Sequence, residues 1–97
     1  MASSITTAEE LLRAGDIGRC ELVRGKLVMM VPAGGEHGDI AYELGYRLGE
    51  YVRPRKLGKI LAAETGFLIS RMPDTVRAPD VAFVRAGRLA ISQGYIP

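Results

Sequence analysis

Hydrophobic and polar positions change period several times along the chain, and these changes predict its first elements. The segment "TTAEELLRAG" places two threonines three residues ahead of two glutamates, a capping-box pattern that predicts a short helix over residues 7–14. Two apolar runs then flank Arg24 and Gly25. A two-residue connection with glycine second favours a tight turn, so a β-hairpin is predicted over residues 19–31.

The longest periodic segment is "HGDIAYELGYRLGEYVRP". Its acids lie near the start and its bases near the end, which is the order that the helix dipole favours, and Pro54 is expected to close the helix. Its large apolar residues recur at helical spacing as one stripe, namely Ile40, Leu44, Leu48, Tyr51 and Val52. The glycine-rich loop "AGGEHG" ahead of it lacks the spacing of a phosphate-binding fingerprint, so that function is excluded.

The second half of the chain reads as short strands separated by turns. Residues 59–64 and 67–70 are expected to form two strands or one bent strand, and residues 71–77 a turn. A further strand over residues 79–84 has apolar residues on both faces, which predicts a position inside a sheet that is covered on both sides. A short helical turn is expected over residues 86–92, followed by an exposed tail.

These elements give an α/β (α+β) fold class, and the chain of 97 residues suggests a single domain. We place its core at about residues 19–85 and a tail at 86–97. The net charge of +2 is too small by itself to indicate a nucleic-acid partner. Cys20 is alone, fits a reducing compartment and is expected to be a small residue entering a strand. No run has the length of a signal peptide or membrane span, so a cytoplasmic location without a membrane partner is expected.

Two aspartates follow prolines, and their surroundings differ. Asp80 heads the apolar strand, where a partly desolvated carboxylate needs a cation, a hydrogen-bond donor or a metal to stay charged. The alternative for Asp80 is a structural ion pair with Arg77 or Arg85. Asp74 lies in Pro-Asp-Thr, which is typical of an ordinary turn.

Other carboxylates and the single histidine are further candidates. Glu36 and His37 open the long helix, where they serve either as ordinary helix-start residues or at the mouth of a site with histidine as ligand or base. Glu64 is either a solvent-facing strand end or a second carboxylate near Asp80. Glu21 raises the same question with weaker support.

Four cations lie within seven residues at the end of the long helix and the loop after it. They are Arg53, Arg55, Lys56 and Lys59. Cations at this place complement the helix dipole and aid solubility. The functional alternative is a contact surface for the phosphate backbone of a nucleic acid.

The order of three segments, "ELVRGKLVMMVPAGGEHGDIAYELGYRLGEYV", "GKILAAETGFLIS" and "RAPDVAFV", resembles the Uma-two (Uma2) restriction endonuclease family. The resemblance covers about residues 19–85 and implies the restriction-endonuclease-like core of the PD-(D/E)XK nuclease superfamily. It implies that Asp80 is the aspartate of the Pro-Asp half-motif, with Glu36, His37 and Glu64 as further catalytic positions. Asp80 and Glu64 would then hold Mg²⁺ or Mn²⁺, hard ions that prefer carboxylate oxygens and activate water for attack on a phosphodiester.

The sequence departs from that family in one respect. It contains neither Glu-x-Lys nor Asp-x-Lys, whereas the family carries a later strand "E-V-x-S-P" with a downstream lysine. We therefore expect an N-terminal, truncated portion of the domain that is inactive alone. An open apolar edge near residues 79–84 would favour a homo-oligomer. A non-catalytic DNA-binding or protein-interaction module, or a purely structural fragment, stays as an alternative.

Overall fold

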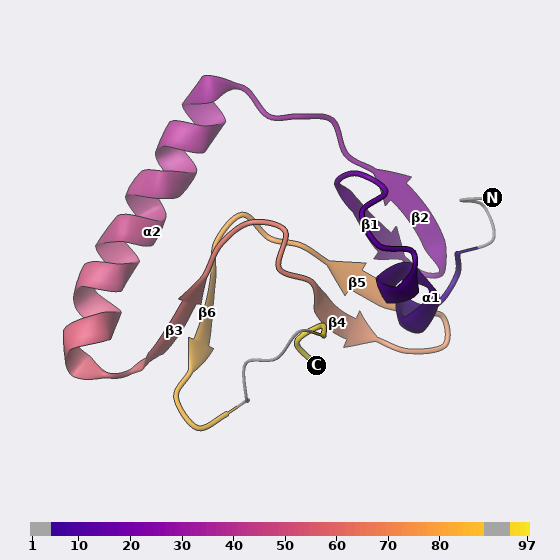
Figure 1. The fold of residues 1–97 in the computed structure, drawn as a ribbon. Helices are drawn as coiled ribbons and strands as arrows, with labels where there is room; N and C mark the ends of the chain where they lie inside the picture. Colours follow the sequence, from indigo (N-terminus) through magenta and orange to yellow (C-terminus); the bar gives the residue numbers. More distant parts are fainter. Residues whose placement is uncertain (1–4, 89–93) are drawn as a thin grey trace. The chain divides into compact units, whose positions relative to one another are not determined.

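The computed structural model describes residues 5–88 and 94–97, which fall into two compact units (Figure 1). The unit that we call the sheet unit comprises Met1–Pro32, Gly66–Ala78 and Ser92–Pro97. The helix unit comprises Ala33–Thr65 and Pro79–Ile91. In the described part of the chain no helix is long and apolar enough to cross a membrane.

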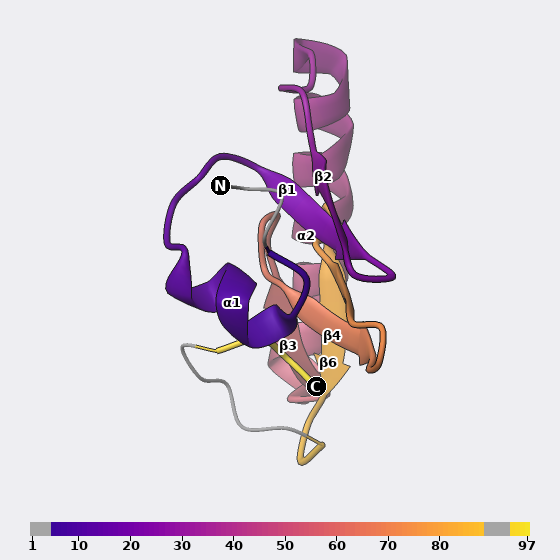
Figure 2. The same cartoon turned by 90° about the vertical axis from the view of Figure 1, so that its right-hand side faces the viewer.

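The sheet unit contains α1 and a four-stranded antiparallel sheet in the order β2-β1-β5-β4 (Figure 1 and Figure 2). Its elements are α1 (Ala8–Arg13), β1 (Cys20–Val23), β2 (Lys26–Met29), β4 (Phe67–Ser70) and β5 (Thr75–Arg77). The predicted short helix is confirmed, because Thr7 caps α1 and forms the complete capping box with Glu10. The predicted hairpin is also confirmed, and Arg24 and Gly25 adopt φ values of 49° and 77° in its turn.

The core of the sheet unit centres on Leu22, which is fully buried in β1. Ala8 and Leu11 of α1 and Val76 of β5 complete the cluster around it. Ile96 is also buried and forms a parallel bridge with Phe67. The expectation of an exposed tail is therefore wrong at Ile96, because a sheet edge is available to pair with it. Residues 86–88 form a turn, and the rest of the predicted helical turn over 86–92 lies outside the described residues.

The predicted turn over residues 71–77 is a turn only as far as Asp74. The next three residues form β5, which pairs with β1 on one side and β4 on the other. The Asp74 carboxylate is buried and accepts hydrogen bonds from the backbone N–H of Ala8 (2.8 Å) and Met72 (3.2 Å) and from Arg71 Nη1 (3.1 Å). The bond from Ala8 is the main reason why the pKa of Asp74 lies below its usual value. The turn interpretation of Asp74 is confirmed, and its carboxylate also holds the start of α1.

The helix unit contains α2 (Gly35–Arg55) and an antiparallel pair of strands, β3 (Gly58–Leu61) and β6 (Ala82–Arg85). The predicted long helix is confirmed, although it begins at Gly35 and ends one residue after Pro54. Lys56 takes a left-handed conformation after the last turn and leads directly into β3.

The predicted apolar stripe does not coincide with the side of α2 that is buried. Ile40, Leu44 and Tyr51 are exposed, whereas Leu48 and Val52 are half-buried and buried. The other half-buried positions are small residues, namely Ala41, Gly45 and Gly49. A Cβ built at Gly45 would lie 3.9 Å from Val81 Cγ2, so small residues, and not the large ones, face this part of the unit.

The expectation that residues 79–84 form a strand covered on both sides is wrong. The strand β6 begins at Ala82 and, among the described residues, pairs only with β3. Val84 is buried, but Phe83 on the other face is 47% exposed. A face of a strand is covered only where another element packs on it, and the exposure of Phe83 shows that one face of β6 is left partly open. Asp80 therefore precedes the strand and does not lie inside a covered sheet.

Candidate functional site

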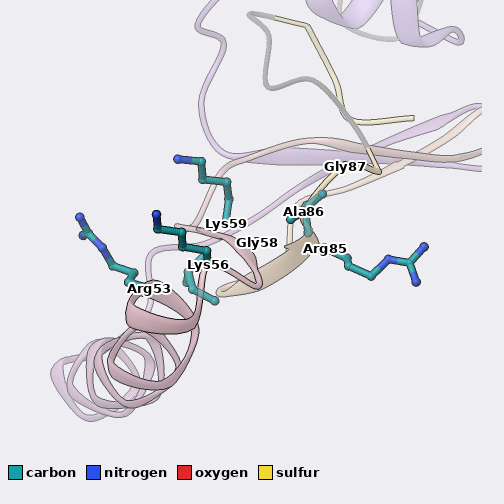
Figure 3. A pocket seen from close by; sticks show the side chains of 9 residues that line it. Arg53, Lys56, Gly58, Lys59, Arg85, Ala86 and Gly87 are labelled. Carbon is teal, nitrogen blue, oxygen red and sulfur yellow. The ribbon is translucent and has the colours of Figure 1, made fainter.

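A concave pocket of about 740 Å³ lies within the helix unit, formed by the end of α2, β3 and β6 (Figure 3). Its volume is within the range of pockets that bind small ligands. The lining residues are Arg53, Lys56, Gly58, Lys59, Ile60, Val84, Arg85, Ala86 and Gly87. Four of them are basic and none of these described lining residues is acidic, so the pocket is electropositive.

The pocket depends on the close approach of β3 and β6 where Gly58 faces Arg85 in the strand register. A Cβ at Gly58 would collide with the carbonyl oxygen of Val84 and the ring of Phe83. Only glycine therefore fits here, immediately after Lys56 and Leu57 have turned the chain out of α2. The cations at the end of α2 are thus brought beside the strands.

Three of the four predicted phosphate contacts lie together in this pocket. The cationic groups of Arg53, Lys56 and Lys59 extend to the same side in Figure 3, whereas the guanidinium group of Arg85 extends to the opposite side. The fourth predicted contact, Arg55, is not among the lining residues. Its Nη1 donates a hydrogen bond to the Tyr51 carbonyl (2.9 Å), and its Cζ lies 3.9 Å from the centre of the Tyr51 ring.

His37 and Asp80 form the second feature of the helix unit. His37 Nε2 lies 3.1 Å from Asp80 Oδ2, and the two side chains are 49% and 43% exposed. At this distance the imidazole Nε2 can donate a hydrogen bond to the carboxylate oxygen. The structure therefore brings together two predicted site residues that are 43 positions apart in the sequence, from the first turns of α2 and from the loop ahead of β6.

Arg77, one of the two cations expected as an ion-pair partner of Asp80, makes an ion pair within the sheet unit. Its Nη1 donates to Glu21 Oε1 at 3.0 Å, and Glu21 Oε2 also accepts from the backbone N–H of Ala78 at 2.8 Å. Glu21 is thereby placed in a structural contact between β1 and the end of β5.

The remaining predicted acids lie elsewhere in the helix unit. Glu36 is exposed in the first turn of α2, and Glu64 is exposed in the turn after β3 with a φ of 69°. Over residues 5–88 and 94–97, no three or more His, Cys, Asp and Glu side chains form a group that could hold a metal ion. The His37–Asp80 pair brings together one imidazole and one carboxylate, and among the described residues no second carboxylate joins it to make such a group.

Cys20 lies in the sheet unit at the first position of β1, as predicted, and is partly buried. Burial raises the pKa of its thiol, with the charge of Glu21 as a smaller cause. A raised pKa keeps the thiol protonated near neutral pH, which disfavours a nucleophilic role.

Comparison with known protein families gives one match. The Uma2 family model, described as "Putative restriction endonuclease", matches residues 7–96. The chain belongs to the Uma2 family. The resemblance seen in the sequence is thereby confirmed, and the Uma2 match extends beyond residues 19–85 to include α1 and Ile96. Both the basic pocket and the His37–Asp80 pair fall within the matched region. No curated protein sequence matches the chain.

Proposed function

We propose that this Uma2 chain is an endonuclease-type domain whose basic pocket binds the phosphate backbone of DNA. One observation carries the proposal: Arg53, Lys56 and Lys59 present their charges on the same side of a concave pocket, whose described lining contains no acid. Lysine and arginine supply most of the sequence-independent affinity for nucleic acid by neutralising phosphates. The family description supports the same partner, since a restriction endonuclease acts on DNA.

The proposed acid–base chemistry centres on Asp80 and His37. The His37 imidazole lies within hydrogen-bond distance of the Asp80 carboxylate, so it can hold that carboxylate in place. In the restriction-endonuclease-like core that the resemblance implies, Asp80 is a ligand of Mg²⁺ or Mn²⁺, and Glu64 and Glu36 are further candidates. Because the described residues do not gather these acids into one group, we propose that this chain alone binds DNA and cleaves it slowly or not at all.

Two assays test this proposal. One follows the binding of a DNA duplex in EDTA, and the other follows the cleavage of plasmid DNA with Mn²⁺. We expect binding that the combined variant Arg53→Gln, Lys56→Gln, Lys59→Gln loses and that Arg85→Gln retains. We expect no nicking above background. A folded chain that binds no duplex at low salt would overturn the proposal. Rapid Mn²⁺-dependent nicking that is lost in Asp80→Ala would show instead that the chain supplies a working catalytic set.

A second candidate function is association with another copy of the chain through β6. Among the described residues, the edge of β6 that faces away from β3 has no strand beside it. Phe83 on this strand is about half exposed. An unpaired edge with exposed apolar residues is a template for pairing with another strand, so we propose a homo-oligomer that uses residues 79–84.

A further inference from the structure

Two tyrosines on α2 form an exposed aromatic pair outside the pocket. The ring centroids of Tyr42 and Tyr46 are 6.5 Å apart and the ring planes are 16° from parallel. The two residues are 73% and 53% exposed. Aromatic side chains offer large flat apolar surfaces on which the planar groups of a ligand can stack.

The pair lies on the same side of α2 as one of the pocket cations. With about 3.6 residues per turn, positions 42, 46 and 53 fall within roughly 40° of one another around the helix axis. Arg53 is the first of the cations that line the pocket. The distance from position 42 to position 53 is about 16 Å along the axis. Tyr51, by contrast, lies roughly 180° from Tyr42.

We propose that Tyr42 and Tyr46, together with Arg53, Lys56 and Lys59, form a binding surface for single-stranded nucleic acid. Bases stack on the tyrosine rings, and the pocket cations bind the backbone. This inference rests on the proposed function because both use the pocket. Aromatic side chains beside a basic groove are the combination by which proteins bind single strands without reading their sequence.

The charges around the tyrosines favour bases at the tyrosine end of the surface and phosphates at the pocket end. Glu43 is occupied by Arg47, whose Nε lies 2.8 Å from Glu43 Oε2. The neighbouring Glu50 carboxylate raises the pKa of the Tyr46 hydroxyl. The carboxylates therefore disfavour phosphates beside the rings, and the backbone is favoured where Arg53 begins the pocket.

A single strand fits this surface better than a duplex does. In a duplex the base faces are stacked on one another and are not available to tyrosine, whereas unpaired bases can stack on aromatic rings. At the phosphate spacing of B-DNA, about 3.4 Å per strand, 16 Å corresponds to roughly five phosphates. A more extended single strand would place fewer nucleotides over the same length.

Fluorescence anisotropy in EDTA provides the test, with a labelled oligothymidylate of about twelve nucleotides and a duplex of the same length as probes. We expect the double variant Tyr42→Ala, Tyr46→Ala to bind the oligothymidylate at least about fivefold more weakly, which is the low end for the loss of one stacked base. Duplex affinity should change by less than about twofold. Tyr51→Ala is the matched control, an exposed tyrosine on the opposite side of the same helix. Tyr42→Phe, Tyr46→Phe should keep the parent affinity because the rings remain.

The outcomes separate this inference from the proposed function. If the chain binds neither probe, the proposed function fails. If duplex binding still depends on the pocket cations but the alanine double variant binds oligothymidylate like the parent, only the inference fails. Equal weakening by Tyr51→Ala would also overturn it. The inference would also be overturned if the alanine double variant lowered the oligomer mass on light scattering without changing oligonucleotide affinity. The tyrosines would then contact a second copy of the chain.

Discussion

The salt dependence of DNA binding is the property that the three pocket cations should control most directly. Each phosphate neutralised on a duplex contributes about −0.9 to the slope of log affinity against log salt concentration. Three contacts from Arg53, Lys56 and Lys59 therefore contribute about −2.7 to that slope. Between 50 and 200 mM salt, this slope corresponds to a loss of roughly 40-fold in affinity. Replacing all three by glutamine should remove that part of the dependence.

The assay is a fluorescence anisotropy titration of a labelled duplex in EDTA at several KCl concentrations. The combined variant should bind more weakly at low salt and show a slope shallower by about 2.7, and each single variant a slope shallower by about 0.9. Arg85→Gln and Arg55→Gln are the matched controls, since each removes one charge without removing a cation of that cluster. The reasoning is refuted if the controls flatten the slope as much as the single variants do, or if the combined variant keeps the parent slope.

Three further predictions concern stability and assembly. Leu22→Ala should lower the free energy of unfolding by about 2–5 kcal/mol in urea denaturation, because Leu22 is fully buried. Val31→Ala, at an exposed position, should change the free energy of unfolding little. Equal effects of the two variants would contradict the core assignment. The folded-state pKa values of Asp74 and Glu9 are lowered, and that of Glu9 is lowered to about 2, mainly by the hydrogen bond from Arg71. The stability that these two carboxylates contribute is therefore complete above the ordinary carboxyl pKa values. It is lost as the pH falls through the lowered, folded-state pKa values. Thermal melts should therefore show stability falling between about pH 4.5 and 2, with a smaller fall in Asp74→Asn, and a melting temperature independent of pH in this range would count against it. Size-exclusion chromatography with light scattering should show a homo-oligomer that Phe83→Lys weakens, and a parent chain that is monomeric at micromolar concentration would exclude association through β6.

Elements with a local signal were predictable from the sequence. The capping box fixed the start of α1, and Arg24 and Gly25 fixed the turn of the hairpin, because each signal depends on residues a few positions apart. The strand β5 was not predictable. Its only apolar residue is Val76, and it is a strand because Val76 pairs with Leu22 of β1, more than 50 positions away.

In the candidate site, too, residues with a local signal were predictable from the sequence, and residues brought together by strand pairing were not. The cluster of Arg53, Lys56 and Lys59 could be found from the sequence because these cations are neighbours along the chain. Arg85 joins the pocket lining only through the register of β3 with β6, for which the sequence holds no local signal. The pairing of Asp80 with His37 was harder still to find, since the two residues are 43 positions apart in the sequence.

The tyrosine pair also had a local signal in the sequence. Tyr42 and Tyr46 are four residues apart in a segment predicted as helical, so their rings were bound to lie on one side of the helix. Their exposure could not be inferred, because it depends on how little of α2 the strands β3 and β6 cover.

Binding of nucleic acid by the pocket of the helix unit can be located residue by residue in an NMR titration. Amide chemical shifts of the ¹⁵N-labelled chain would be followed while an unlabelled oligonucleotide is added in EDTA. We predict saturable shifts in residues 53–60 and 84–87, with residues 20–29 and 67–77 largely unchanged. Shifts concentrated in the strands of the sheet unit, or no saturable shifts at all with the folded chain, would contradict the account.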